Sequence, residues 1–103
     1  MAKGYWIARV DVAYPEGYKR YVAANAVPFK KYGARFLVRG GNFDNVEGGS
    51  RQRNVVIEFP SVQAAKDCYH SPEYQAAIAL RAPVSAADIV IVEGYDGPQP
   101  GDA

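Results

Sequence analysis

The sequence is poor in the residues that build disulfides and metal sites. Its 103 residues contain one cysteine, Cys68, and one histidine, His70. A single cysteine excludes an intramolecular disulfide and a cysteine-based metal cluster within one chain, and the lone histidine gives no HxH or HxxxH spacing. We therefore expect no metal and no cofactor. The lack of disulfides favours a reducing, cytoplasmic location.

An excess of charge of one sign and long hydrophobic runs are also missing. Twelve basic residues stand against 11 acidic ones, which gives a net charge of +1. This balance leaves no electrostatic footprint for nucleic acid or an anionic membrane, and we expect neither as a partner. The longest purely apolar run, residues 76–80, is far too short to span a bilayer, which takes roughly 20 residues. Arg9 and Asp11 interrupt the N-terminal apolar run, which makes it a poor signal peptide.

The overall composition is that of one small globular domain. Hydrophobic residues make up 49% of the chain and charged residues 22%, a normal balance for a folded protein. We assign residues 1–95 to a single domain and expect the proline- and glycine-bearing residues 96–103 to form a flexible tail. A domain of this size buries a modest fraction of its surface, so a partner subunit would stabilise it.

Hydrophobic periodicity predicts the order strand, helix, strand, strand, helix, strand. Strands are expected at residues 4–12, 34–41, 54–59 and 87–93. The first helix starts near Pro15 and ends before Gly33, and Pro28 should kink it or divide it into two segments. The second helical region follows Pro60 and restarts at Ser71-Pro72. Ser61 and Ser71 are expected to cap its two segments.

This order predicts the ferredoxin-like βαββαβ arrangement, an α+β fold with helices on one face of a four-stranded antiparallel sheet. The opposite face is too apolar for solvent, since it carries Tyr5, Ile7, Leu37 and Val56. The last strand, residues 87–93, is apolar on both faces and suits a fully buried strand. We therefore expect a second copy of the chain to cover the open face as a homodimer. The pair Gly40-Gly41 is expected to bend or bulge the second strand.

Four segments carry a resemblance to a known family: GYWIARVDV, ARFLVRGG, RNVVIEFPS…A…CYHSPEYQAA and IVIVEG. Over residues 4–94 the chain resembles the domain of unknown function 1330 family of the dimeric α+β barrel superfamily. The resemblance implies a dimer in which two sheets face each other. It also implies distant kinship with antibiotic-biosynthesis monooxygenases, haem-degrading monooxygenases, muconolactone isomerases and stress-responsive dimeric barrel proteins. The residue pattern of the haem-degrading enzymes is not seen here, and the family has no established activity.

In such a fold a cleft between sheet and helices is the natural place for a small molecule. Arg9 and Glu58 lie on the mixed faces of their strands, and Arg39 joins them if the second strand bulges suitably. They form either a carboxylate-and-guanidinium site for a polar or anionic ligand, with Glu58 as proton acceptor, or an intersubunit salt bridge. We favour the structural role.

Two further residues are candidates for ligand binding. Asn25 is the polar member of an apolar helical stripe, and it contacts either a ligand or a backbone group near Pro28. His70 is the obvious acid–base group, although a histidine at a helix end more often lies at the surface or caps carbonyls. The tyrosines on helical stripes and Cys68 are better explained by packing.

The sequence thus favours a homodimer that binds a small molecule between sheet and helices. The alternative is a cofactor-independent isomerase or monooxygenase that acts on a small metabolite. Such an enzyme needs few protein groups, since the substrate itself supplies the reactivity, and it would leave little trace in the sequence.

Overall fold

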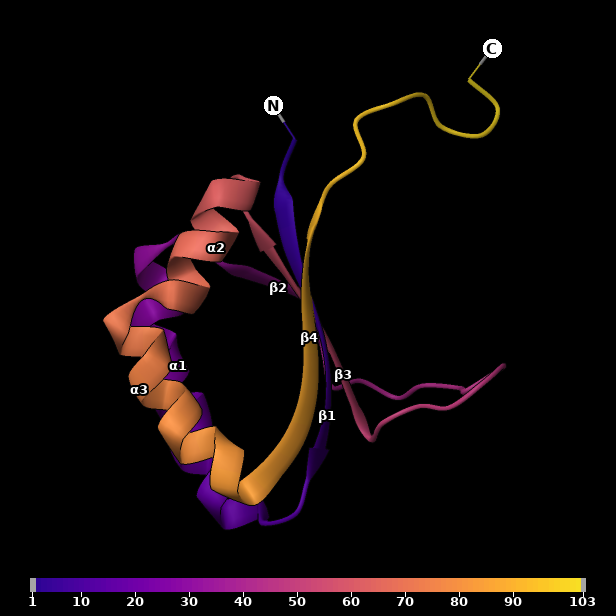
Figure 1. Cartoon of the computed structure of the whole chain (residues 1–103). Coiled ribbons are helices and arrows are strands. Elements are labelled where there is room, and N and C mark those ends of the chain that lie inside the picture. Colours follow the sequence, from indigo (N-terminus) through magenta and orange to yellow (C-terminus); the bar gives the residue numbers. More distant parts are fainter. Residues whose placement is uncertain (1, 103) are drawn as a thin grey trace.

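A computed structural model describes residues 2–102 of the chain and has two layers (Figure 1). The strands form one antiparallel sheet in the order β2-β3-β1-β4. The elements in chain order are β1 (Gly4–Val12), α1 (Pro15–Lys31), β2 (Arg35–Arg39), β3 (Arg53–Phe59), α2 (Val62–His70), α3 (Pro72–Arg81), a 3₁₀ turn η1 (Ala82–Val84) and β4 (Ser85–Glu93). The predicted α+β, ferredoxin-like fold is confirmed.

All three α-helices cover the same face of the sheet, and the other face is bare (Figure 1). The connection between β2 and β3, residues 40–52, projects on the side away from the helices. We call these residues the β2–β3 hairpin. The C-terminal segment beyond β4 extends from the same end of the sheet as the N-terminus. Alternation along β1 and β3 explains the two faces, since successive side chains of a strand point to opposite sides.

The core lies between the helices and the sheet and is centred on Trp6. This side chain is 1% exposed, and its indole Nε1 donates a hydrogen bond of 2.9 Å to the backbone oxygen of Ala65 in α2. The rings of Phe29, Phe59 and Tyr74 lie 4.9–5.3 Å from the Trp6 ring, centroid to centroid. Aromatic contacts of this kind join α1, α3 and both central strands to one point.

The predicted helix ends are confirmed. Ser61 Oγ accepts a hydrogen bond from Ala64 N (3.0 Å), and Ser71 Oγ accepts one from Tyr74 N (3.1 Å). Gly33 follows α1 with a positive φ of 73°, where a residue without Cβ is favoured. Pro28, however, lies inside one continuous helix and does not divide it.

The chain bends at Gly40, one of the two outcomes predicted for Gly40-Gly41, but the bulge falls inside β2 instead. Phe36 pairs with Ile57 and Val38 with Val56, which leaves Leu37 as the extra residue. The two glycines lie beyond the last β2–β3 pair. The shift sends Phe36 to the helix side and Val38 to the open side, so these two do not share a face as the simple alternation predicted.

The same shift decides the direction of Arg39. This residue pairs with Val55, which is buried on the helix side of β3. Arg39 therefore belongs to the helix-side face. The last strand also differs from expectation: β4 is an edge strand, and Val90 is 53% exposed on the open face within a single chain.

Candidate functional site

A cavity of about 30 Å³ lies between α1, α3 and the helix side of the sheet. Apolar side chains of all four strands make up much of its wall. The polar residues that line it are Tyr18, Tyr21, Asn25, Arg39, Arg53, Tyr74 and Arg81. The lining thus includes three arginines and no carboxylate.

Two of these arginines, the buried Arg81 and the partly buried Arg53, line the cavity without an anionic partner. Arg81, in the last turn of α3, is only 8% exposed, and Arg53 opens β3. The Nε atoms of both are buried and have no hydrogen-bond acceptor among residues 2–102. Within that range, neither these two nor Arg39 forms an ion pair. The cavity is therefore strongly cationic.

Tyrosine rings offset part of the cost of burying these charges. The guanidinium carbon of Arg81 lies 5.5 Å from the Tyr21 ring centroid, and that of Arg53 lies 5.8 Å from the Tyr18 centroid. A cation over an aromatic face gains about 0.5–2 kcal/mol. Burying a charge without a partner ordinarily costs more than this. The tyrosine contacts alone therefore do not balance the free-energy cost of placing these unpaired arginines at the cavity, which argues against a purely structural role.

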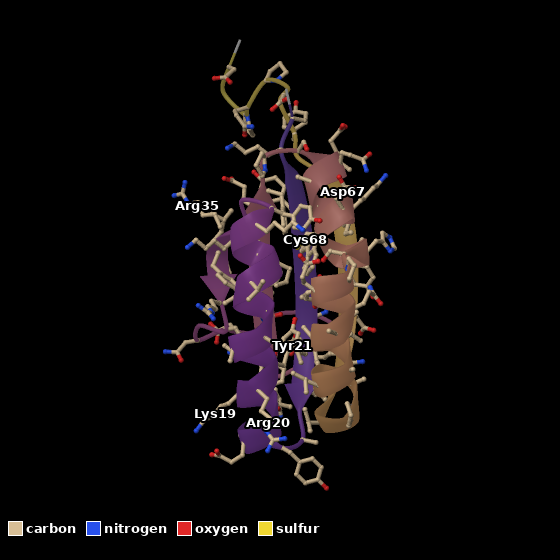
Figure 2. The ribbon with its side chains drawn as sticks, turned by 90° about the vertical axis from the view of Figure 1, so that its left-hand side faces the viewer. Lys19, Arg20, Tyr21, Arg35, Asp67 and Cys68 are labelled. Carbon is tan, nitrogen blue, oxygen red and sulfur yellow. The ribbon has the colours of Figure 1, made fainter. Side chains whose placement is uncertain are left out.

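The cavity wall also contains a pair of hydrogen-bonded tyrosines. The hydroxyl oxygens of Tyr21 and Tyr74 lie 2.6 Å apart and join α1 to α3. Figure 2 shows Tyr21 between these two helices. Burial is the main cause that raises the pKa of Tyr74, and the neighbouring Tyr21 raises it further. Burial also raises the pKa of Tyr18. The hydroxyls of Tyr74 and Tyr18 therefore keep their protons and remain hydrogen-bond donors at the cavity wall.

Gly40 leaves room for the Arg53 side chain at the start of the β2–β3 hairpin. Its φ is +69°, and its backbone nitrogen donates a hydrogen bond of 2.8 Å to the Asn54 oxygen. A Cβ atom here would lie 3.0 Å from the Arg53 guanidinium carbon and closer still to Nη1. A glycine is needed both for the left-handed backbone and for this close approach.

The structure brings together two of the five residues proposed from the sequence. Asn25 is 5% exposed and lines the cavity from α1, and Arg39 lines it from β2. Arg39 itself is exposed, with its guanidinium carbon 4.1 Å from the Phe36 ring centroid. The cavity consequently reaches the surface at Arg39.

Arg9 and Glu58 lie on the open face and do not meet within the chain. Glu58 is opposite Tyr5 on β1, four residues from Arg9. It accepts hydrogen bonds from Tyr5 Oη (3.1 Å) and Lys3 Nζ (3.4 Å). Arg9 donates to Asn54 Oδ1 (3.3 Å) and to the Gly49 oxygen (3.2 Å), which holds the β2–β3 hairpin against β1.

His70 lies apart from the cavity, at the exposed C-terminal end of α2. Its ring meets that of Tyr69 edge-on, with centroids 5.2 Å apart. It borders a shallow surface depression together with side chains of β4. This position offers solvent access but none of the arginines.

Arg53 and Arg81 were not identified as candidates from the sequence, although a signal for them exists. Arg53 is two residues from Val55 on a strand face that is otherwise apolar, and Arg81 is seven residues after Tyr74 on an apolar helical stripe. The same criterion, a polar residue in an apolar stripe, selected Asn25. Applied to every stripe, it would have found all three.

Other chemistry has little support in the described part of the chain. No group of three or more His, Cys, Asp or Glu side chains among residues 2–102 is arranged to hold a metal ion. Burial raises the pKa of the Cys68 thiol to about 12, which opposes a role as a nucleophile. No helix in residues 2–102 has both the length and the apolar character to cross a membrane.

An antiparallel βαββαβ sheet with helices on one face and a polar-lined cavity between the layers defines a ferredoxin-like α+β protein. Residues 3–95 match the family described as Domain of unknown function (DUF1330), and the chain belongs to this family. A comparison with curated proteins gave no match.

Solved structures share the fold at low sequence identity. A protein of unknown function from Rhodopseudomonas palustris, RPA0582, is 18% identical, with a TM-score of 0.70 over 93% of this chain and 85% of its own. SnoaB, a cofactor-independent oxygenase from Streptomyces nogalater, is 12% identical (TM-score 0.62; 96% of each chain). A dimeric ferredoxin-like protein of unknown function from Thermobifida fusca is 19% identical (TM-score 0.58; 89% of each chain).

Proposed function

We propose that the protein is a homodimer that binds a small molecule in the cavity between α1, α3 and the sheet. The observation that carries this proposal is the convergence of Asn25 and Arg81, both more than nine-tenths buried, on one cavity. Buried polar groups that point into an otherwise apolar space are the usual means by which a protein orients a ligand.

The bare face of the sheet supports self-association. It exposes Ile7, Val38, Val90 and Val92, each at least 40% accessible in the single chain. A contiguous apolar surface of this kind is characteristic of an interface. The Thermobifida fusca neighbour is described as dimeric. A second copy would bury the open face and complete the barrel expected from the sequence.

A ligand screen tests the binding proposal. Thermal-shift measurements with a library of small metabolites should identify compounds that raise the melting temperature of the wild type, since a ligand that binds only the folded state stabilises it. Asn25→Leu should lose most of this response. Asn42→Leu, the same substitution at an exposed position of the β2–β3 hairpin, should retain it. A response that Asn25→Leu leaves intact would place the ligand elsewhere.

A cofactor-independent isomerase or monooxygenase is the second candidate. The Tyr21–Tyr74 hydroxyl pair at the cavity wall favours it, because two hydrogen-bonded hydroxyls can pass a proton to or from a bound substrate. SnoaB supplies a fold-level precedent. Oxygen-uptake and product assays with the compounds found in the screen test this candidate, and Tyr74→Phe should abolish turnover more strongly than binding.

We also propose a cytoplasmic location, on the ground that Cys68 is a single, buried thiol without a disulfide partner. Fractionation of cells that express the tagged chain would test it directly.

A further inference from the structure

The charges around the cavity are of one sign. Arg39, Arg53 and Arg81 line it, and no acidic side chain does. Each of the ion pairs among residues 2–102 lies elsewhere, at the helix surface, around Arg51 or at Glu58. The carboxylates that form ion pairs in this part of the chain therefore lie elsewhere, and the three cavity arginines have none beside them.

The buried donors define where an anion would bind. Arg81 is more than nine-tenths buried, and its Nε has no acceptor among residues 2–102. The Nε of Arg53 is in the same state on the opposite layer of the cavity. A buried charged donor without an acceptor destabilises a protein, whereas the same donor bound to an anion forms one of the stronger hydrogen bonds known in proteins.

We propose that the cavity binds the carboxylate group of a small organic acid, with Arg81 and Arg53 as the residues that neutralise it. This inference rests on the proposed function and specifies its ligand class. The tyrosine hydroxyls and Asn25 supply further hydrogen bonds to the carboxylate.

Size favours a carboxylate over a phosphate. The cavity holds about 30 Å³, which suits a headgroup but not a complete metabolite. A carboxylate is flat and needs donors only in its plane, although a guanidinium can pair with either group through two parallel hydrogen bonds. A phosphate carries its oxygens tetrahedrally and needs donors on all sides. The rest of the ligand extends past Arg39, the exposed lining residue at the surface.

The experiment compares acids with their neutral amides. The probes are formate, acetate, propionate and benzoate, each paired with its amide, and inorganic phosphate, all at one ionic strength set with sodium chloride. Thermal shift and calorimetric titration of the wild-type protein should detect at least one acid that binds about tenfold or more tightly than its amide, as a charge-assisted pair predicts. Arg81→Met and Arg53→Met should each remove this preference. Arg20→Met is the matched control, since it removes the same charge from the exposed surface of α1 (Figure 2).

Four results would overturn the inference. In the first, an acid and its amide bind equally well, and Asn25→Leu abolishes the binding of both compounds. The cavity would then be a site for neutral ligands, and the proposed function would stand. Another is phosphate that binds more tightly than every carboxylate. The third is acid binding that Arg81→Met leaves unchanged and Arg20→Met weakens, which would place the anion on the surface. The fourth is that no probe and no compound of the metabolite screen binds, which would overturn both the inference and the proposed function.

Discussion

The hydroxyls of Tyr21 and Tyr74 lie 2.6 Å apart across the interface of α1 and α3, at the wall of the cationic cavity. Both side chains are buried. This hydrogen bond therefore links the two longest helices directly beside the cavity, and it couples helix packing to the geometry of the site.

Removing one hydroxyl of this pair should destabilise the protein. Tyr74→Phe leaves the buried Tyr21 hydroxyl without its partner, which should lower the free energy of unfolding by about 1–2 kcal/mol. The double variant Tyr21→Phe/Tyr74→Phe should cost less than the sum of the single variants, because the second substitution removes the unpaired group. Chemical denaturation measures these differences. Tyr14→Phe, at an exposed position, serves as control, and simple additivity would show that the hydrogen bond is energetically unimportant.

Arg81→Met should behave in the opposite way. Methionine has a similar length and no charge, so it removes an unpaired buried cation while it keeps much of the packing. We expect the melting temperature to stay the same or to rise by about 4 °C or more, as roughly 1 kcal/mol gives in a domain of this size. A stabilised variant that no longer binds acids would identify Arg81 as a binding residue kept at the expense of stability. A clear fall in melting temperature would instead identify it as structural.

The features that were predictable from the sequence depend on local patterns. The Ser61 and Ser71 caps, the ending of α1 at Gly33 and the two-faced β1 are each determined by neighbouring residues, and all are as predicted. The bulge in β2 was not predictable, because it depends on how β2 pairs with β3. That pairing is a property of two strands 14 residues apart, and the alternation within one strand does not contain it.

The site was only partly predictable for the same reason. Asn25 stood out because it interrupts an apolar stripe, but the direction of Arg39 depends on the bulge at Leu37. Arg9 and Glu58 share a face of the sheet, as predicted, yet the register sets them four residues apart. Sequence alternation assigns a residue to a face. It does not say which residues of that face are neighbours.

Gly40→Ala should disturb the cavity from outside the core. The substitution forces a non-glycine residue to a φ of +69° and brings Cβ against the Arg53 guanidinium. We expect a loss of about 1–2 kcal/mol in unfolding free energy, since both strain and displacement of Arg53 contribute. Acid binding should weaken as well. Gly41→Ala is the matched control, because nothing lies within 4 Å of a Cβ at that position. Equal effects of the two substitutions would exclude a role for the contact with Arg53.

Cys68 should be inert in the folded protein and should make stability depend on alkaline pH. Burial raises the pKa of its thiol from 9.0 to about 12. Between these two pH values the folded protein keeps the thiol proton while the unfolded chain loses it. The free energy of unfolding should therefore fall as the pH rises from about 9 toward 12. At pH 8 a thiol reagent should modify Cys68 only after denaturation. Stoichiometric modification of the native protein would contradict this burial.

A charge on the open face should prevent the homodimer from forming. Val90, which is 53% exposed on β4, faces away from the helices, so a glutamate there does not enter the core of the single chain. Light scattering should give twice the 11.2 kDa chain mass for the wild type and the single chain mass for Val90→Glu. Val27→Glu makes the same change on α1, at a side chain that is 62% exposed, and should remain dimeric because the helices lie on the opposite face of the sheet. A wild type that is monomeric at micromolar concentration would overturn the proposal, and a dimer lost only in Val27→Glu would move the interface to the helices.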